Sequence, residues 1–565
     1  MKFLRPALAC AALAPALSAQ TQLFQLQGVG EGDQFGFTVA ILGDVDGDGL
    51  SDWIVGAPGS GEGAPRAGAA KVVSGATGQF VHELFGALGG DSFGNAVDAV
   101  GDLDLDGRAD FVVGTYQEDS GGVDAGRVQV YSGQTATLLF ETLGLELFDN
   151  LGYDVAGGGD INNDGTPDVV VGVPGQGASL NNAGRTLVLS GAGGAPLYTF
   201  PGENGLDGHG WSVDGAGDWN NDGFADVIVG AIGAIDPDPT FPALDFNHGR
   251  AYIYSGADGS LLETFDGEAS TENLGWSVAG LGDTNGDGVA DVAVGSPFHQ
   301  GPGFDRGRVQ VFSGPSGIRL LELVGDEDGE WCGFAVGTAG DLNDDGKNDL
   351  LVGSPFGTGQ LATAGSALGV NVDGGFILFE LQGETALGEF GIALDGAGDI
   401  NGDGIVDVVV GADFEENDNN QQPGGARVFS SQDLVLTTSD NAVSLQEGKL
   451  VKFNFDFGSL LADQFFLVLG TASGILPGTP LTPSITLPLN PDAYTNTLLA
   501  NPNQPPIVPS FGGLDALGRG FTFLNIPANT DPNLAGLLLH HAVVGIQTTG
   551  QIGGASNATP LVLMP

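Results

Sequence analysis

Basic residues are scarce in this chain of 565 residues. It contains 16 Lys and Arg against 71 Asp and Glu, so its formal net charge at neutral pH is −55. Such a charge argues against nucleic acid or an anionic membrane surface as a partner. It is compatible with a protein that binds cations, and also with a secreted protein whose acidic surface keeps it soluble in saline surroundings.

Cysteine and long apolar runs are also scarce. Lys2 and Arg5 precede an apolar stretch at residues 7–16, and small residues end this segment, so we expect residues 1–19 to be a secretory signal peptide. One of the two cysteines, Cys10, lies in it, and the remaining Cys332 cannot form an intramolecular disulfide. No later run of about 18 apolar residues occurs, so no membrane span is expected. We expect a secreted protein, extracellular or at the cell surface.

What the chain does have is glycine, with 99 residues, and one acidic loop that occurs seven times. The first copy, residues 44–52, has aspartate at positions 1, 3, 5 and 9 and glycine at position 6. The first aspartates of successive copies are separated by five intervals of 58 residues and one of 65. A fixed period of this length indicates a repeat architecture.

Each repeat has the pattern of four short strands. Typical examples of the four strands are residues 35–40, 168–172, 126–133 and 138–144, with the acidic loop between the first two strands. Seven such units predict an all-β fold, a seven-bladed β-propeller over residues 20–434. The fourth-strand pattern occurs at residues 23–28, before the first loop, and has no good copy after the seventh unit. We therefore expect the N-terminal strand to complete the last blade and close the ring.

The units resemble the FG-GAP repeats of integrin alpha-subunit propellers and their bacterial relatives. The Phe-Gly pair is intact at residues 35–36, 93–94 and 390–391, and the Gly-Ala-Pro triplet at residues 56–58. In the other units the phenylalanine is replaced, by Leu151, His209, Leu274 and Cys332. The resemblance covers roughly residues 22–432. It implies calcium in the loops, which family members often carry in some blades only.

The acidic loop has the donors that calcium prefers. Calcium takes six to eight oxygen ligands, and side chains at positions 1, 3 and 5 converge when the chain turns at a glycine. The carbonyl at position 7 and the aspartate at position 9 complete the expected set. The loop is not an EF-hand, because position 12 of the first copy is Val55, in an apolar strand. Asp-Gly turns also occur without metal, but carboxylates this close would repel each other without a cation.

We therefore expect up to seven structural Ca²⁺ ions, one in each blade. The expected side-chain ligands, loop by loop, are Asp44, Asp46, Asp48 and Asp52; Asp102, Asp104, Asp106 and Asp110; Asp160, Asn162, Asp164 and Asp168; Asp218, Asn220, Asp222 and Asp226; Asp283, Asn285, Asp287 and Asp291; Asp341, Asn343, Asp345 and Asp349; and Asp399, Asn401, Asp403 and Asp407.

The composition changes near residue 435, where the acidic loops stop and proline becomes frequent. Apolar runs such as residues 451–457 and 521–526 alternate with turn residues. This pattern predicts a small β-sandwich-like domain of unknown role at residues 435–565.

The face opposite the acidic loops is the expected ligand face. Its longest loop spans about residues 231–248, and Phe298, His299, Phe304 and Trp331 lie in neighbouring loops. Aromatic side chains on variable loops suit recognition of an extracellular protein or a glycan. They are equally suited to holding their own loops in place.

No catalytic group of residues is evident in the sequence, so we do not predict an enzyme. The six histidines are scattered, and no G-x-S-x-G motif occurs. His209 and Cys332 occupy the first-strand position of phenylalanine, which favours packing over catalysis. The sequence indicates a secreted calcium-binding propeller that serves as an adhesion or ligand-binding module. The alternatives are a polysaccharide-active enzyme or its accessory domain, and a structural component of the cell surface or matrix.

Overall fold

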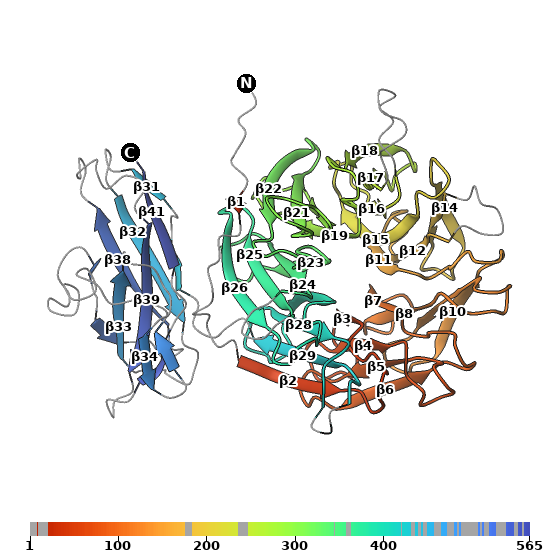
Figure 1. The fold of residues 1–565 in the computed structure, drawn as a ribbon, viewed down its shortest axis with the longest axis horizontal. Helices are drawn as coiled ribbons and strands as arrows, with labels where there is room; N and C mark the ends of the chain where they lie inside the picture. The colour runs from red at the N-terminus through yellow and green to blue at the C-terminus, as the bar shows by residue number, and fades with distance from the viewer. Residues whose placement is uncertain are drawn as a thin grey trace. The chain divides into compact units, whose positions relative to one another are not determined.

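The computed structural model describes residues 8–9, residues 21–430 except 176–182, 235–246, 344, 358–362, 418 and 420, and a set of C-terminal strands. The chain divides into two units, one containing Gln22–Phe429 and the other Ser430–Pro565. No described residue lies in a helix. The first unit is a ring of seven antiparallel sheets of four strands each, with a fifth strand added at one edge (Figure 1). The predicted seven-bladed β-propeller is therefore confirmed.

In each of the first six blades the strands are consecutive and lie in the order of the chain, with the first strand nearest the centre of the ring. The blades are, in order, β3 (Thr38–Ile41), β4 (Trp53–Ala57), β5 (Ala69–Val73) and β6 (Phe80–Phe85); β7 (Ala96–Gly101), β8 (Asp110–Thr115), β9 (Arg127–Tyr131) and β10 (Leu138–Leu143); β11 (Val155–Gly159), β12 (Asp168–Val173), β13 (Arg185–Leu189) and β14 (Pro196–Pro201); β15 (His209–Gly217), β16 (Asp226–Ala231), β17 (Arg250–Tyr254) and β18 (Leu261–Asp266); β19 (Ser277–Gly282), β20 (Asp291–Ser296), β21 (Arg308–Ser313) and β22 (Ile318–Val324); β23 (Ala335–Gly340), β24 (Asp349–Ser354), β25 (Ser366–Asn371) and β26 (Phe376–Gln382); and β27 (Leu394–Gly398), β28 (Asp407–Ala412) and β29 (Gly425–Ser430).

The N-terminal strand β2 (Thr21–Gln27) completes the seventh blade. It lies beside β29 as the fourth strand of that sheet, so the two ends of the ring are joined in one blade. This confirms the expected closure of the ring by the N-terminal strand. Of the expected signal peptide, only β1 (Leu8–Ala9) is described, and it pairs in parallel with β22.

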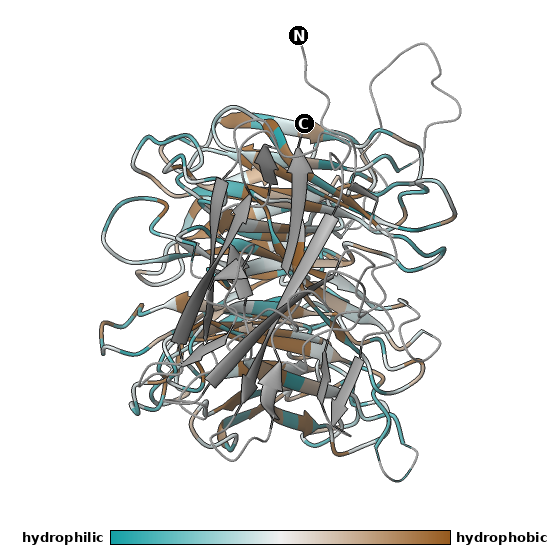
Figure 2. Cartoon of the chain, turned by 90° about the vertical axis from the view of Figure 1, so that its left-hand side faces the viewer, coloured by the Kyte–Doolittle hydropathy of each residue, from teal (hydrophilic) through white to brown (hydrophobic). Residues whose placement is uncertain are grey.

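The core lies between neighbouring blades. Both faces of a blade are covered, so the second strand of each blade reads as a continuous apolar run and is buried over its whole length, as in β4 and β12. One cluster packs Ile54 of the first blade against Phe111 and Val113 of the second. Figure 2 shows the brown, hydrophobic strands inside and the teal, hydrophilic loops at both edges of this unit.

The Phe-Gly pair joins each blade to the preceding one. Phe93 is buried and forms a parallel bridge with Gly68, at the start of the third strand of the first blade. Gly94 has a φ of +80°, and a Cβ there would lie 2.3 Å from the carbonyl oxygen of Ala69. Only glycine tolerates both conditions. Leu151, Leu274 and Cys332 form the same bridge and are buried, so the replaced first-strand positions keep their packing role.

The C-terminal unit is described by its strands alone. They are β30 (Leu436–Thr438), β31 (Ala442–Ser444), β32 (Lys449–Asp456), β33 (Phe465–Thr471), β34 (Thr479–Thr482), β35 (Ile485–Leu487), β36 (Ile507–Val508), β37 (Phe511–Gly513), β38 (Arg519–Ile526), β39 (Leu538–Ile546), β40 (Ile552–Ala555) and β41 (Thr559–Met564). They form sheets of four and six strands and a two-stranded hairpin. The packing of these sheets as a sandwich stays a prediction. The part of the chain that the structure describes has no helix that is long and apolar enough to cross a membrane.

Candidate metal centres and the central channel

All seven acidic loops connect the first strand of a blade to its second strand. The first loop, for example, lies between β3 and β4, and the second between β7 and β8. Because every blade has the same strand order, the seven loops lie on one face of the ring. The loops between second and third strands lie on the other face.

The aspartate at position 9 is completely buried in all seven loops. Asp52 Oδ2 accepts hydrogen bonds from the backbone N–H of Val45 at 2.8 Å and of Asp46 at 3.2 Å, and Oδ1 accepts one from Gly75 N at 2.8 Å. Asp110 makes the equivalent bonds with Leu103 and Gly133. This carboxylate therefore ties its loop to the end of the third strand, whether or not it also binds a metal.

Burial sets the ionisation of these position 9 carboxyls. Loss of hydration disfavours the charged form, and it raises the pKa of Asp168 to about 6 and that of Asp407 to about 7, although backbone N–H donors oppose the change. The pKa of Asp349 rises to about 8, because the charge of Asp345 adds to the effect of burial. A cation beside these groups would favour their charged form.

The side chains at positions 1, 3 and 5 converge in the first two loops. One carboxylate oxygen from each of Asp44, Asp46 and Asp48 lies within 4.8 Å of the other two, and the same holds for the trio of Asp102, Asp104 and Asp106. Backbone N–H groups hold them in place. Asp44 Oδ2 accepts from Gly49 N at 3.0 Å, and Asp48 Oδ1 accepts from Leu50 N at 2.9 Å.

In the other five loops an asparagine replaces the position 3 aspartate. Asn220 Nδ2 donates to Asp222 Oδ2, at position 5. In the other four loops the amide nitrogen donates toward the position 9 carboxylate, as from Asn162 Nδ2 to Asp168 Oδ1 at 3.3 Å. The amide oxygen is thereby turned away from that carboxylate. In two loops this oxygen, on Asn220 and on Asn343, is buried and has no hydrogen-bond partner among the described residues. An unpartnered oxygen beside carboxylates fits an oxygen-preferring cation such as calcium.

One basic side chain reaches a predicted metal ligand. Arg108, at position 7 of the second loop, donates from Nη1 to Asp44 Oδ2 of the first loop at 2.7 Å. A Cβ at Gly47 would lie 2.1 Å from Arg108 Nη2, so glycine makes room for the guanidinium. Sequence reasoning missed this contact, although a basic residue at position 7 of an otherwise acidic loop was the available signal.

A second acidic group lines the central channel. The first strands of the blades surround a cavity of about 540 Å³, and four aspartates face it: Asp98, Asp154, Asp214 and Asp395. Each accepts a backbone hydrogen bond from the next blade, such as Gly157 N to Asp98 Oδ2 at 2.8 Å and Ile41 N to Asp395 Oδ2 at 2.7 Å. Burial raises the pKa of Asp98 to about 6 and those of Asp154 and Asp395 to about 7. Sequence reasoning missed this group too.

Aromatic residues extend from the channel into the loops opposite the acidic face. Tyr153 contacts Trp211, and Trp211 contacts Trp276, with ring centroids 4.7 and 5.1 Å apart. Phe298 packs edge-on against both Trp276 and Trp331. These contacts support the reading that the aromatics hold their loops in place.

Other predicted positions have mixed outcomes. Phe304, on the expected ligand face, is exposed. Most of the longest loop of that face, residues 235–246, lies outside the described residues. His209 is buried between Thr186 and Tyr254, at 3.2 and 3.0 Å, and burial lowers its pKa to about 3. These contacts confirm a packing role for His209.

Sequence comparison gives the repeats their name. The sequence model of the FG-GAP repeat matches residues 35–73, 93–131, 151–189, 274–312 and 333–368, which are the first three, the fifth and the sixth blades. Five of the seven blades therefore contain FG-GAP repeats. The fourth and seventh units lie outside these ranges and have the same strands and the same acidic loop.

The FG-GAP propeller is similar to integrin alpha subunits. It is 34% identical over 216 residues to integrin alpha-5 of Xenopus laevis, which is 36% of this chain and 20% of that protein. It is 33% identical over 246 residues to integrin alpha-8 of Mus musculus, covering 40% and 22%, and 31% identical over 217 residues to integrin alpha-V of Gallus gallus, covering 36% and 20%. The match spans about a fifth of each of these relatives.

Proposed function

We propose that this chain is a secreted ligand-binding or adhesion module, in which calcium stabilises the acidic face of the propeller and the opposite face binds an extracellular protein or glycan. The observation that carries the calcium part is the convergence of three carboxylates in each of the first two loops. Together with the unpartnered amide oxygens of Asn220 and Asn343, it supports a cation among these side chains.

The residues at positions 1, 3 and 5 would hold calcium, and the buried aspartate at position 9 would offer a further carboxylate oxygen. The position 9 carboxylate is already fixed by backbone donors, so it offers a preorganised oxygen. Calcium would supply the positive charge that five of the seven loops lack entirely, and it would hold the turn between the first and second strands. Up to seven structural ions are proposed, one in each blade.

Similarity to integrin alpha subunits supports a binding module over an enzyme. The described residues that line the channel include acids but no Lys, Arg or His, so they do not form the mixed acidic and basic cleft that a polysaccharide-active enzyme would favour. An array of glycans and matrix proteins tests this proposal. Selective retention of one class supports it, whereas cleavage of a glycan or no retention at all contradicts it.

The calcium sites are tested by thermal melting in chelator and in calcium. At about ten times the Kd, each site stabilises the folded state by about 1.4 kcal/mol, so loss of calcium from several sites lowers the melting temperature by many degrees. Magnesium serves as the control, since it demands a stricter geometry. The same melting temperature with and without calcium would overturn the proposal.

Two variants of the first loop separate calcium binding from loop structure. Asp48→Asn changes a position 5 side chain at the surface, so it should reduce the stabilisation by calcium and have little effect in chelator. Asp52→Ala removes three backbone hydrogen bonds, so it should destabilise in both conditions, by about 2 kcal/mol in chelator. Equal behaviour of the two variants would contradict the distinct role given to position 9.

A further inference from the structure

Six of the seven third strands carry a basic residue. These residues are Lys71, Arg127, Arg185, Arg250, Arg308 and Arg427, and each forms an ion pair with an acid from the same blade or from a loop beside it. The exception is β25 of the sixth blade, whose sequence Ser-Ala-Leu-Gly-Val-Asn has no Lys or Arg.

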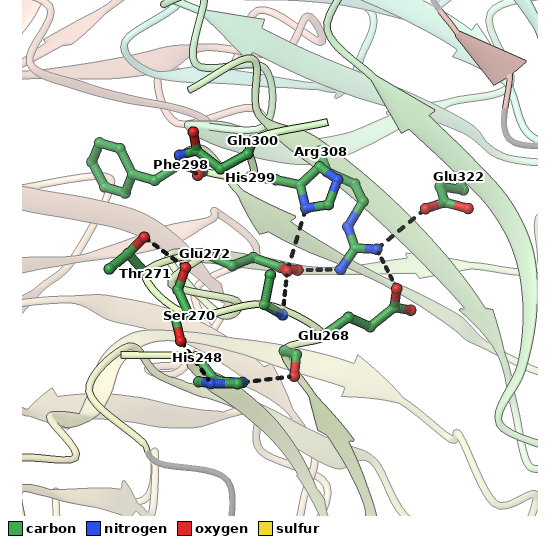
Figure 3. Close-up of polar contacts among 12 residues, drawn as sticks. His248, Glu268, Ser270, Thr271, Glu272, Phe298, His299, Gln300, Arg308 and Glu322 are labelled. Atoms are coloured by element: carbon green, nitrogen blue, oxygen red, sulfur yellow. Dashed lines mark hydrogen bonds and ion pairs between the residues drawn. The ribbon is translucent and has the colours of Figure 1, made fainter. Parts of the chain in front are cut away.

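The fifth blade shows what the basic residue does. Arg308 is buried and donates to the buried carboxylate of Glu272 (Figure 3). Its Nη1 also lies 3.1 Å from Glu268 Oε2 and 3.2 Å from Glu322 Oε1. On the other side, His299 Nδ1 lies 3.3 Å from Glu272 Oε2. Burial alone would raise the pKa of Glu272, but the bond to His299 and the charge of Arg308 lower it.

The sixth blade keeps the acids of this cluster and loses both of its basic partners. The repeat of 58 residues relates the two blades position by position. The three carboxylates are retained, at Asp326 for Glu268, Glu330 for Glu272 and Glu380 for Glu322. The two basic side chains are replaced by small residues, Ser366 for Arg308 and Gly357 for His299.

The small residues lie beside the retained glutamate. A Cβ at Gly357 would be 3.1 Å from Ser366 Oγ and 3.8 Å from Glu330 Cγ, so these three residues meet. The cross-strand neighbours of Ser366 are Ser354 and Gln382. Gln382 Oε1 is a buried atom without a hydrogen-bond partner among the described residues, and its position in the fifth blade is held by Val324. Ser354 Oγ also has no partner there, but neither has its counterpart Ser296 Oγ in the fifth blade, so this hydroxyl does not distinguish the two blades. Hydrogen-bond acceptors therefore gather where the fifth blade has its guanidinium.

The pKa values of these acids also reflect the missing basic partners. Burial raises the pKa values of Glu330 and Glu380 to about 7, and that of Asp326 is raised as well. Arg306 is the basic residue that acts on Asp326, but its Nε donates to the exposed Asp328 at 2.8 Å. The three acids thus lack the buried cation that neutralises their counterparts.

We propose that the sixth blade binds an alkylguanidinium group through the carboxylates of Asp326, Glu330 and Glu380 and the hydroxyl of Ser366. The equivalent carboxylates already bind one in the fifth blade, and a planar guanidinium offers five N–H donors to separate acceptors. A small metal ion fits less well, because these acids do not bring three oxygens within 4.8 Å of one another as the first two loops do. The group can come from a free small molecule or from an arginine of a partner protein.

The test is calorimetric titration of the calcium-loaded full chain at constant ionic strength. The probes are ethylguanidinium and the blocked peptide acetyl-Gly-Arg-Gly-amide, with tetramethylammonium and the matching lysine peptide as references. We expect at least one guanidinium probe to bind about tenfold more tightly than its reference. If only the peptide binds, the site recognises an arginine side chain in a polypeptide. If both probes bind equally, the guanidinium group alone is sufficient for recognition.

Three variants locate the site. Ser366→Arg supplies the missing guanidinium from within the blade, so it should raise the melting temperature and weaken probe binding by about tenfold. Glu330→Gln should weaken binding to a similar extent, and it decides the question if Ser366→Arg does not fold. Glu31→Gln is the control, because it removes one charge from an exposed site in another blade-joining loop and should leave binding unchanged.

Any of three results overturns the proposal. The first is that the guanidinium probes bind no more tightly than their references, and the second is that a folded Ser366→Arg variant binds the probes as well as the wild type does. The third is that no guanidinium probe binds and that calcium binding depends on Glu330. None of these results bears on the acidic loops of the other face, so failure here is distinguishable from failure of the calcium proposal.

Discussion

The two faces of the propeller hold their carboxylates under different conditions. On the acidic-loop face, the side chains of Asp44, Asp46 and Asp48 meet each other and accept hydrogen bonds from their own backbone. On the opposite face, a buried acid such as Glu272 is in direct contact with an arginine from the third strand of its blade. The carboxylates of one face gather at the proposed calcium sites, and a buried acid of the other face is neutralised by an arginine of its own blade.

This difference shows how a chain with few basic residues keeps so many carboxylates. Six of its 16 Lys and Arg lie on third strands and form ion pairs within the blades. The central channel differs from both faces. Its four aspartates accept hydrogen bonds from backbone donors, and the described residues that line it include no basic residue. Burial raises the pKa values of Asp154 and Asp395 to about 7, which favours their uncharged form below neutral pH.

The largest effect is expected where the internal cation is removed. Arg308→Met leaves Glu272 buried without its main partner, which should reduce the free energy of unfolding by about 3–5 kcal/mol. Adding Glu272→Gln should restore part of the loss, since no charge then remains buried. Urea denaturation in calcium measures both.

Arg319→Met is the matched control for that experiment. Arg319 pairs with Glu268 and Glu322 in the same blade, but it is about a third exposed, so its loss should cost less than about 1 kcal/mol. Equal losses for Arg308→Met and Arg319→Met would show that burial of the ion pair does not distinguish the two faces.

The sequence predicted the repeated elements and the closing strand, and it missed side-chain contacts between neighbouring blades. The acidic loops, the closing strand β2 and the packing of His209 follow from local pattern and period. Asp154, in contrast, bonds to Val213 of the next blade, 59 residues away, and no short-range pattern pairs them. A carboxylate immediately before an otherwise apolar first strand was the signal that could have identified it.

The ion pairs of the third strands were missed for a related reason. Arg308 and Glu272 are 36 residues apart, and each is an ordinary charged residue in the sequence. Their contact depends on how the loop before the first strand folds over the start of the third. The position 9 aspartates were predicted as metal ligands, and only the structure shows that their oxygens also accept backbone bonds from the third strand, as Asp52 does from Gly75.

A change of intermediate size is expected from the pH dependence of the channel. The folded-state pKa values of Asp154 and Asp395, about 7, lie above the unfolded value near 4, so the folded protein binds more protons between about pH 4 and 7. The contribution of these groups to stability is therefore present at the lower pH and is lost as the pH rises through about 7. Asp98 and Asp214 act in the same direction, and Tyr116 and Tyr153 face the same cavity.

Asp154→Asn tests this pH dependence. The variant carries no titrating group at this position, so it should lose about 2 kcal/mol less stability than the wild type between pH 5 and 7.5. Chemical denaturation at both pH values measures the difference. Glu31→Gln, an exposed neutralisation, is the control and should follow the wild type. An unchanged pH dependence in Asp154→Asn would show that protons are not what the channel uses.

The smallest effect concerns the place where an internal cation reaches the acidic-loop face. Arg108 donates to Asp44 Oδ2 at 2.7 Å, so its guanidinium and a calcium ion in the first loop would share one carboxylate. Both side chains are more than a quarter exposed, so in chelator Arg108→Gln should cost only about 0.3–1 kcal/mol. In calcium the loss should disappear or reverse, because removal of a nearby positive charge favours binding of the ion. Arg319→Gln is the control, since Arg319 is similarly exposed but pairs with Glu268 and Glu322, away from the acidic loops. Its effect should be the same in chelator and in calcium, whereas an Arg108→Gln effect that does not depend on calcium would show that the arginine and the ion do not compete for Asp44.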